Sequence, residues 1–527
     1  MERFAELLNR LVYTPSRNRK LDLLAEYFAT TPDPDRGYAL AALTDGLFSR
    51  LPLRRILAQL LEPHVDPVLF HLSRDYVGDT AETVALLWPD RHAGPPPKLS
   101  EVVETIAVAG RLDAAHVIAG FLDRLDADGR FALLKLLTGA MRTGVSARLA
   151  KTGLAQWAGR EVTEIEEVWN CVAPPYPDLF AWLEGRGPRP EPGDLPVFRP
   201  FMLAHPIEEG DWAGLDPEEF LAEWKWDGIR VQIATGKRGT RLYSRGGDDV
   251  SGAFPDIIES FAGLEIVADG ELLVLRDGKV QPFNELQQRL NRKSVTPRML
   301  AHYPAHLRLY DLLLEDGEDV RPLPFSERRR RLEAWYRAVQ PPRSDLSELI
   351  AFKSFGELRE LWTAARRRGI EGLMLKRKSS PYIAGRPKGH WFKWKRSPLT
   401  LDCVLMYAQR GSGKRSSYYS DYTFGVWRRG DGGGEELVPV GKAYFGFTDE
   451  ELLELDRFVR THTVERFGPV RAVTPTLVLE VAFDAVQRST RHKSGLAMRF
   501  PRIHRIRWDK PAEEADRLEG LAALVET

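Results

Sequence analysis

A lysine followed by Asp-Gly is the first candidate for covalent chemistry in this sequence. Lys225 lies in the run EWKWDGIR, which spans residues 223–230. A lysine amine can attack a phosphorus atom only in its neutral form, and burial beside other cations favours that form. The tetrad KWDG is short enough to arise by chance, and its ordinary interpretation is a surface lysine before an Asp-Gly turn. A nucleophile at this position therefore needs support from other residues.

Three further lysines could supply positive charge around such a nucleophile. Lys376 ends the run EGLMLK, and Lys393 and Lys395 alternate with aromatic residues in WFKWK. Side chains alternate across a strand, so Lys393 and Lys395 would share one face and the aromatic rings the other. We expect the fold to bring the three lysines near Lys225, where they would neutralise a phosphate under attack. Each of them alone is more often a solvated surface charge.

Composition places the chain among globular proteins of several domains. It has 527 residues, 43% of them hydrophobic, and a formal net charge of zero. The balance conceals two basic regions: residues 321–396 hold 20 lysines and arginines against 7 acidic residues, and residues 486–510 hold 8 against 1. Such local excess suits a phosphate-binding channel. The run SERRRRLEAW from Ser326 is interpreted instead as a solvated helix face.

Cysteine usage and hydropathy argue against a disulfide-rich, zinc-binding, secreted or membrane protein. Cys171 and Cys403 are the two cysteines of the sequence, and they are too few for a disulfide framework or a cysteine zinc module. The sequence has neither a signal peptide at its N-terminus, MERFAELLNRLVY, nor an apolar stretch long enough to span a bilayer. We therefore expect a soluble cytoplasmic protein with no membrane partner.

Periodicity predicts three domains that would position these residues. Residues 1–185 show helical spacing, as in Phe4, Leu7, Leu8 and Leu11, and predict an all-α domain. The Pro/Gly-rich stretch EGRGPRPEPGDLP from Glu184 marks a boundary. Residues 198–398 mix strand-like runs with helices and predict an α/β (α+β) core, and residues 399–527 predict about five strands, a small barrel of OB type. A Thr448/Glu451 capping box predicts one helix among those strands.

The order of several motifs resembles that of the covalent nucleotidyltransferase superfamily, and specifically of ATP-dependent DNA ligases. After KWDG come SRGGDD at Ser244, ADGELL at Ala268, RLYDLLLEDG at Arg308, EGLMLK at Glu371, WFKWK at Trp391 and RIRWDK at Arg505. The N-terminal runs FAELLNRLVYTPSRNRKLDLLAEYF and LKLLTGAMRTGVSARL resemble the helical DNA-binding domain of these ligases. The resemblance covers nearly the whole chain. It implies a helical DNA-binding domain, a nucleotidyltransferase core and an OB-fold domain.

The resemblance also assigns roles within the core. It implies that Lys225 carries AMP, that Glu223 reads the adenine amine, and that Tyr310 and Met374 cover the two faces of the base. Glu271 and Glu371 are the candidate Mg²⁺ ligands, since hard cations take carboxylate and phosphate oxygens together. The resemblance places Arg230 near the ribose and Arg245 near a DNA 5′-phosphate. It also implies that Lys376, Lys393 and Lys395 contact the nucleotide, whereas Arg386 matches the family more loosely.

Outside the core, the resemblance singles out two more groups. The run RIRWDK, termed the C-terminal motif below, contains Arg505, Arg507, Asp509 and Lys510. The family uses these positions, Arg507 and Lys510 among them, to orient the β- and γ-phosphates of ATP. In GAMRTGVS, Arg142 and the glycines Gly139 and Gly144 would contact minor-groove phosphates. The other interpretation of GAMRTGVS is a plain turn between two helices.

These features together predict an ATP- and Mg²⁺-dependent ligase of nicked double-stranded DNA. NAD-dependent ligases are disfavoured because they need a cysteine zinc module. An ATP-dependent RNA ligase or a non-catalytic nick-binding protein remain the alternatives. By resemblance we expect a monomer associated with the nucleoid, together with repair nuclease or helicase partners.

Overall fold

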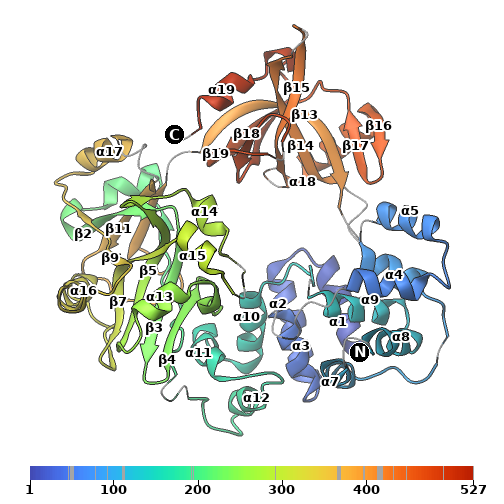
Figure 1. The fold of residues 1–527 in the computed structure, drawn as a ribbon, viewed down its shortest axis with the longest axis horizontal. Helices are drawn as coiled ribbons and strands as arrows, with labels where there is room; N and C mark the ends of the chain where they lie inside the picture. Colours follow the sequence, from blue (N-terminus) through green and yellow to red (C-terminus); the bar gives the residue numbers. More distant parts are fainter. Residues whose placement is uncertain are drawn as a thin grey trace. The chain divides into compact units, whose positions relative to one another are not determined.

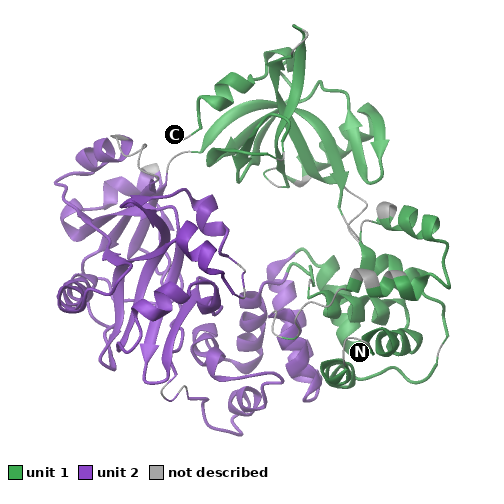
Figure 2. Cartoon of the chain, viewed as in Figure 1, with its two compact units in different colours: residues 1–15, 47–144, 397–527 green, residues 16–46, 145–396 purple. Residues whose placement is uncertain are grey.

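The structure is a computed structural model of the 527-residue chain. It describes all residues except 45–46, 48–52, 78, 92, 110–112, 140, 192, 194, 291, 293, 365–369, 396–397, 412–418, 431–432, 445, 447, 491 and 526–527. The chain separates into two compact units (Figure 2). Residues 1–15, 47–144 and 397–527 form the first unit, and residues 16–46 and 145–396 form the second.

The N-terminal region is helical, as its periodicity predicted (Figure 1). Its helices are α1 (Glu2–Tyr13), α2 (Arg17–Thr30), α3 (Asp35–Leu43), α4 (Leu53–Leu61), α5 (Pro67–Val77), α6 (Thr80–Leu87), α7 (Leu99–Val108), α8 (Ala114–Asp123), α9 (Ala127–Thr138), α10 (Ala147–Ala158), α11 (Val162–Val168) and α12 (Pro177–Leu183). Phe4, Leu7, Leu8 and Leu11 are all buried along one side of α1. After α12, the described residues of the Pro/Gly-rich stretch form no helix or strand. Residues on both sides of the stretch belong to the second compact unit, so a domain boundary at this point stays a prediction.

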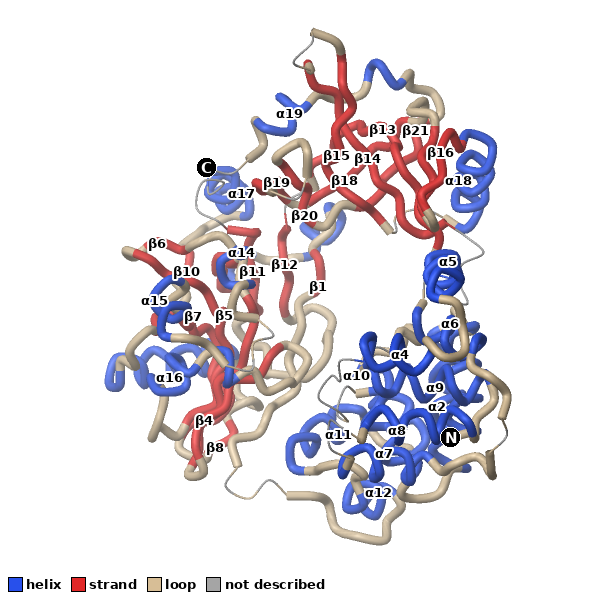
Figure 3. Tube along the Cα trace, turned by 45° about the vertical axis from the view of Figure 1, so that its right-hand side comes forward, coloured by secondary structure: helices blue, strands red, loops and turns tan. Residues whose placement is uncertain are grey.

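Residues 201–395 form a core of two sheets with helices on their outer sides (Figures 1 and 3). The first sheet has the order β1 (His205–Pro206), β12 (Trp391–Lys395), β11 (Ile370–Arg377), β2 (Phe220–Trp226) and β10 (Leu349–Ile350). The second has the order β4 (Gly239–Ser244), β3 (Ile229–Gly236), β5 (Ile266–Arg276), β7 (Ala305–Glu315) and β8 (Glu318–Asp319), with β6 (Lys279–Val280) on β5 and β9 (Ser344–Leu346) on β7. The helices are α13 (Pro255–Ser260), α14 (Phe283–Gln287), α15 (Pro297–His302), α16 (Phe325–Val339) and α17 (Phe355–Ala364).

Alternation along the strands gives the first sheet two different faces. Phe220 and Ala222 of β2 pack with Leu358 and Trp362 of α17 on the outer face. Leu221, between them in sequence, packs instead against the second sheet in a cluster that includes Ala234, Val267, Leu313 and Trp391. Because successive side chains point to opposite faces of a sheet, the odd-numbered residues of β2 face the second sheet. The inner face is where Lys225 and Glu223 lie.

The C-terminal residues form strands around one longer helix, as predicted. β13 (Leu399–Arg410), β14 (Tyr419–Arg429), β15 (Glu435–Ala443), β16 (Thr463–Phe467), β17 (Val470–Val473), β18 (Val478–Phe483) and β21 (Arg502–Arg507) make a seven-stranded sheet, and β19 (Ala485–Arg488) and β20 (Leu496–Arg499) make a hairpin. The helices are α18 (Asp449–His462) and α19 (Leu518–Ala522). The predicted capping box at Thr448 and Glu451 opens α18. The sequence underestimated the strand number, because strands such as β16 are short, largely exposed and polar.

Candidate active site

The residues with candidate chemistry share the inner face of the first sheet. On β2 and β11, Lys225 pairs with Gly372 and Glu223 pairs with Met374. On β12, Lys393 pairs with the same Met374, and Lys395 pairs with the same Gly372. Paired residues of neighbouring strands lie on one face, so the strands bring these side chains together. Phe392 and Trp394 pack on the outer face, as predicted for WFKWK. Trp391 is the exception, because the same two-residue period turns it to the inner face, where it packs between the sheets.

Glycine allows the turn after Lys225 to approach the second sheet closely. A Cβ atom on Gly228 would lie 2.5 Å from the carbonyl oxygen of Leu272 and 2.8 Å from Cγ of Glu271. A side chain at this position would therefore displace β5. The glycine of the KWDG tetrad places the lysine beside the strand that carries Glu271.

Glu371 lies between two ammonium groups. It forms an ion pair with Lys225, and its Oε1 accepts a hydrogen bond from Lys395 Nζ at 2.5 Å. Burial raises the pKa of the Glu371 carboxyl, but the facing Lys225 and Lys395 outweigh burial and lower it below its ordinary value. Lys225 must leave this ion pair before its amine can attack an electrophile.

A second carboxyl group, Glu271 on β5, faces the same region. Its pKa is raised to about 7, mainly by burial; Lys225 and Arg230 oppose the rise, and the nearby Glu371 and Asp227 contribute to it. Two carboxyl groups that oppose each other's ionisation can share a divalent cation, which takes oxygen ligands and keeps water or phosphate oxygens in its remaining positions. Glu271 and Glu371 therefore fit the expected Mg²⁺. Among the described residues, no group of three or more metal-binding side chains occurs.

Several cations gather around Lys393. Burial lowers the pKa of its amine, and the positive charges of Arg386, Lys395, Arg245 and Lys225 lower it further. Arg245 is exposed just after β4. Burial lowers the pKa of its guanidinium, and the nearby charges of Arg230 and Arg386 lower it further, whereas Glu271 opposes the change. The structure thus brings Arg245, Arg386, Lys393 and Lys395 near Lys225, a setting suited to a phosphate.

Lys376 lies beside Glu223 and Tyr310. Its ammonium donates to Glu223 Oε2 at 3.0 Å and lies 4.3 Å from the centroid of the Tyr310 ring. Both Lys376 and Glu223 are buried, and burial lowers the pKa of the Lys376 amine. Met374 stands beside Glu223 in the strand pairing. Lys376 therefore belongs to the group formed by Glu223, Tyr310 and Met374, since the pairing of β2 and β11 sets it opposite Leu221 and not Lys225.

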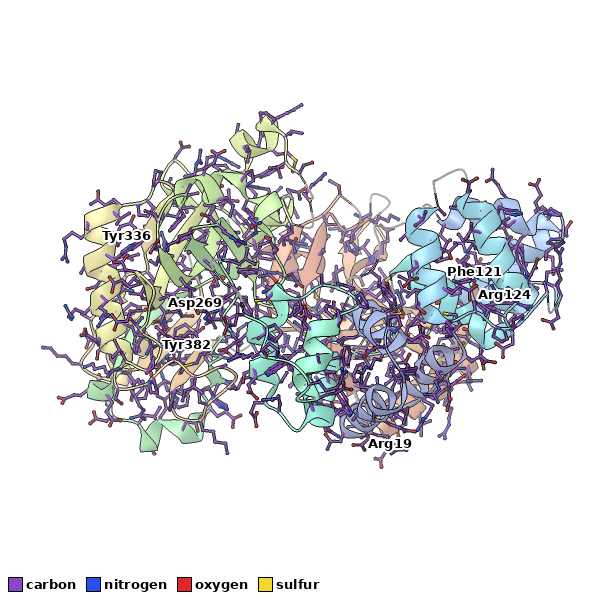
Figure 4. The ribbon with its side chains drawn as sticks, turned by 90° about the horizontal axis from the view of Figure 1, so that it is seen from below. Arg19, Phe121, Arg124, Asp269, Tyr336 and Tyr382 are labelled. Atoms are coloured by element: carbon purple, nitrogen blue, oxygen red, sulfur yellow. The ribbon has the colours of Figure 1, made fainter. Side chains whose placement is uncertain are left out.

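Arg230 is held by a buried network that the motifs did not reveal in full. Its Nη2 donates to Asp269 Oδ2 at 2.8 Å, and its Nη1 donates to the Met202 carbonyl at 2.6 Å. Asp269, which is labelled together with Tyr382 in Figure 4, also accepts a hydrogen bond from the Tyr382 hydroxyl at 2.6 Å and one from Gln232 at 2.9 Å. The aspartate lies inside the ADGELL motif, whereas Tyr382 lies in no motif that sequence reasoning recognised. This network fixes Arg230 close to the Tyr310 ring, 5.8 Å from its centroid.

The interpretation of SERRRRLEAW as a solvated face is wrong for two of its four arginines. Arg328 and Arg329 of α16 are buried, whereas Arg330 is exposed. Arg328 makes two hydrogen bonds to the buried carboxylate of Asp311, and Arg329 faces Glu223. The physical reason is that partners distant in the sequence compensate these two charges, so the helix can turn both toward the core.

The C-terminal motif has partners within its own sheet. Lys510 Nζ donates to Asp402 Oδ2 at 2.7 Å, and Arg507 lies 3.5 Å from the same oxygen. Arg507 also makes two hydrogen bonds to Asp509. Pairing of β18 with β21 sets Arg505 opposite Glu480 and Arg507 opposite Val478. Arg507 and Lys510 therefore share a carboxylate in this structure, and an anionic ligand would have to replace it.

The segment GAMRTGVS joins α9 to α10. Gly139 ends α9 in the left-handed conformation, with φ of 64°, and Gly144 has φ of 66°. Arg142 is exposed and also has a positive φ, 49°. Ser146 then caps α10. The structure confirms a turn between helices, and a phosphate contact at Arg142 and Gly144 stays a prediction.

Comparison with known proteins decides the family. The family described as "ATP dependent DNA ligase domain" matches residues 201–395, and "ATP dependent DNA ligase C terminal region" matches residues 415–510. The "DNA ligase 1" of Korarchaeum cryptofilum is 32% identical, over 100% of this chain and 98% of that protein. The chain belongs to the ATP-dependent DNA ligases. The "Probable DNA ligase" of Koribacter versatilis is 37% identical to this ligase, over 78% of this chain and 75% of that protein.

Solved structures agree at the level of the fold. The structure titled "Pmar-Lig_Pre." has a TM-score of 0.58 and 16% identity, covering 96% of this ligase and 99% of that chain. As a member of its family, the ligase uses ATP and Mg²⁺ and joins nicks in DNA. Across the part of the chain that the structure describes, none of the helices is long and apolar enough to cross a membrane.

Proposed function

We propose that Lys225 is the nucleophile of a three-step nick-sealing reaction. Lys225 Nζ, having lost its proton, attacks the α-phosphorus of ATP, a nitrogen–phosphorus bond forms, and the bond to pyrophosphate breaks. The 5′-phosphate of the nick then takes AMP from the lysine, and the 3′-hydroxyl finally displaces AMP. The observation that supports this proposal most is the position of Lys225 on the inner face of the first sheet, beside Glu371 and a group of cations and near Glu271 of the second sheet.

The chain's own residues prepare the first step. Glu371, held between Lys225 and Lys395, orients the lysine amine toward the inner face. Mg²⁺ held by Glu271 and Glu371 would neutralise phosphate charge and compete with Lys225 for Glu371. Lys393 and Lys395 would neutralise the α-phosphate as the nitrogen–phosphorus bond forms. Arg245 and Arg386 would take the phosphate of the DNA end.

Glu223, Tyr310 and Met374 would form the adenine pocket. A carboxylate only accepts hydrogen bonds, so Glu223 suits the exocyclic amine of adenine. An aromatic ring and a thioether suit the two faces of a planar base. Arg230, fixed by Asp269, would lie near the ribose, and Lys376 would hold Glu223 in place.

The C-terminal motif would act in the first step alone. Arg507 and Lys510 would exchange Asp402 for the β- and γ-phosphates of ATP, which leave as pyrophosphate before DNA chemistry begins. We propose that the strands of residues 399–527 form an OB-fold domain that moves between steps, with the core at residues 198–398 and the helical DNA-binding domain at residues 1–185. Arg142 and Gly144 would contact the DNA backbone.

The remaining proposals concern the setting in which the ligase works. We propose a monomer that acts on nicked double-stranded DNA in the nucleoid, alongside repair nucleases or helicases. Family resemblance supports this setting.

Ligation of matched nicked duplexes tests the proposal. The strand on either side of the nick would be DNA or RNA, and ATP, GTP and NAD would be compared as nucleotide donors. We expect sealing with ATP and DNA on both sides. Preferential sealing of RNA nicks would favour an RNA ligase, and nick binding without formation of lysyl-AMP would favour a non-catalytic scaffold.

A further inference from the structure

Arg329 of α16 lies behind the proposed adenine pocket with two of its nitrogens already fixed. Its Nε donates to Glu333 Oε1 at 2.7 Å, and its Nη2 donates to the Ser347 carbonyl at 2.7 Å. These two contacts, one on its own helix and one on the segment after β9, leave the guanidinium little freedom to rotate. Its third nitrogen, Nη1, is therefore held in one direction, toward Glu223.

Glu223 has one oxygen occupied and one available. Oε2 accepts from Lys376 at 3.0 Å, whereas Oε1 lies 3.5 Å from Arg329 Nη1 without a hydrogen bond between them. Both Glu223 Oε1 and Arg329 Nη1 are buried and have no hydrogen-bond partner among the described residues. Glu223 is 2% exposed, so water does not stabilise this carboxylate. Buried acceptors without a hydrogen bond are rare in proteins, and a donor on a bound ligand would satisfy this one.

The positive charges near Glu223 decide whether its side chain is ionised, and ionisation decides which hydrogen bonds Oε1 can make. A buried carboxylate keeps its charge only when cations compensate it. An ionised carboxylate accepts a hydrogen bond from the amine of a 6-amino purine and repels the 6-oxo group of guanine. A protonated carboxyl group could instead donate a hydrogen bond to that 6-oxo group. Arg329 stands beside the available oxygen, and Lys376 beside the occupied one. Selection of the base therefore depends on both cations.

We propose that Arg329 is a positioning residue that makes the pocket select a 6-amino purine. It holds Oε1 of Glu223 in place and supplies charge beside it, without occupying the hydrogen bond that the base needs. This inference rests on the proposed role of Glu223 as the reader of the adenine amine. We place Arg329 in contact with neither the nucleotide nor the reacting atoms.

The test measures formation of the covalent nucleotidyl-enzyme against concentration for ATP, GTP and purine riboside triphosphate, which lacks a 6-substituent. In R329Q we expect the preference for ATP over GTP to fall on the order of tenfold or more, through KM for ATP more than through kcat. The preference for ATP over purine riboside triphosphate should fall in parallel. The matched control is R330Q, because Arg330 is exposed on the same helix and pairs with Glu327 at the surface. R330Q should keep both preferences.

A conservative variant keeps the test informative if R329Q does not fold. R329K retains the charge, but one ammonium group cannot contact Glu333 and the Ser347 carbonyl and also reach Glu223. R329K should therefore lose part of the ATP preference, whereas R330K should lose none. Thermal unfolding of each variant establishes which proteins are folded. Wild-type preferences in folded R329Q, or in R329K where R329Q does not fold, would overturn the inference.

The variant E223Q separates this inference from the proposed function. If Glu223 reads the amine, E223Q should lose ATP preference, and R329Q/E223Q should lose no more than E223Q alone. An unchanged preference in E223Q would refute the role of Glu223 itself. A loss in E223Q together with no loss in R329Q would refute the role of Arg329 alone.

Discussion

The buried ion pair between Arg328 and Asp311 should dominate the stability of the core around Tyr310. Arg328 Nε and Nη2 donate to Asp311 at 2.8 and 3.0 Å, and Nη1 donates to the carbonyls of Leu323 at 2.5 Å and Ser380 at 2.9 Å. Both charged side chains are fully buried. The perturbation that tests this pair is Arg328→Met, which preserves most of the apolar volume and removes every one of these donors.

The expected magnitude follows from what Arg328→Met leaves behind. Removing one partner of a buried ion pair costs about 3–5 kcal/mol, and an unsatisfied buried carbonyl adds about 1 kcal/mol or more. We therefore expect a loss of about 5 kcal/mol in the free energy of unfolding. For a unit of this size that corresponds to a fall of roughly 10 °C or more in Tm. Arg330→Met, at an exposed pair, should cost less than about 1 kcal/mol.

Urea unfolding followed by tryptophan fluorescence would measure both variants. Arg328→Met combined with Asp311→Leu should recover more than half of the loss, because no uncompensated charge then remains in the core. A loss below about 1 kcal/mol in Arg328→Met would refute the reasoning. So would a double variant that is less stable than the single one.

Two further predictions concern a buried lysine and the C-terminal motif. Burial, with a smaller effect of Arg148, lowers the pKa of Lys151 from 10.5 to about 8. The folded state therefore gains stability as pH rises from about 8 toward 10.5, by about 3 kcal/mol at 1.36 kcal/mol per pH unit. Lys151→Met should stabilise the protein at pH 7 by about 2 kcal/mol, after loss of the ammonium contact with Trp169, and should flatten this pH dependence in urea unfolding. A less stable variant at pH 7 would contradict the argument. Lys510→Ala and Arg507→Ala should each slow lysyl-AMP formation by about 2–4 kcal/mol in the barrier but leave sealing of a pre-adenylylated nick nearly unchanged. An equal loss in both reactions would place these residues at the nick.

Local patterns in the sequence predicted the parts of the site that depend on a single strand. The alternation in WFKWK predicted that Lys393 and Lys395 share a face, because the two-residue period of a strand leaves no other arrangement. The spacing of Phe4 and Leu8 likewise predicted the buried side of α1. Such features follow from a few neighbouring residues, and the structure confirms them.

Features that depend on partners far along the chain could not be predicted in this way. Arg328 and Arg329 are adjacent in an arginine run, and a charge run ordinarily faces water. Their burial depends on Asp311, on a neighbouring strand, and on Glu223, more than a hundred residues earlier. The hydrogen bond from Lys376 to Glu223 is a related case, since the register between β11 and β2 decides the neighbours of Lys376 and the motif does not show that register.

The central claim is that Lys225 carries AMP. Incubation of the ligase with ATP and Mg²⁺, followed by peptide mapping under conditions that preserve a phosphoramidate, locates the adduct directly. We expect AMP on Lys225 and no adduct in folded Lys225→Ala, which lacks the amine, or in folded Lys225→Arg, whose guanidinium stays protonated and cannot attack. An adduct on another residue, or one that forms to the wild-type extent in Lys225→Ala, would contradict it.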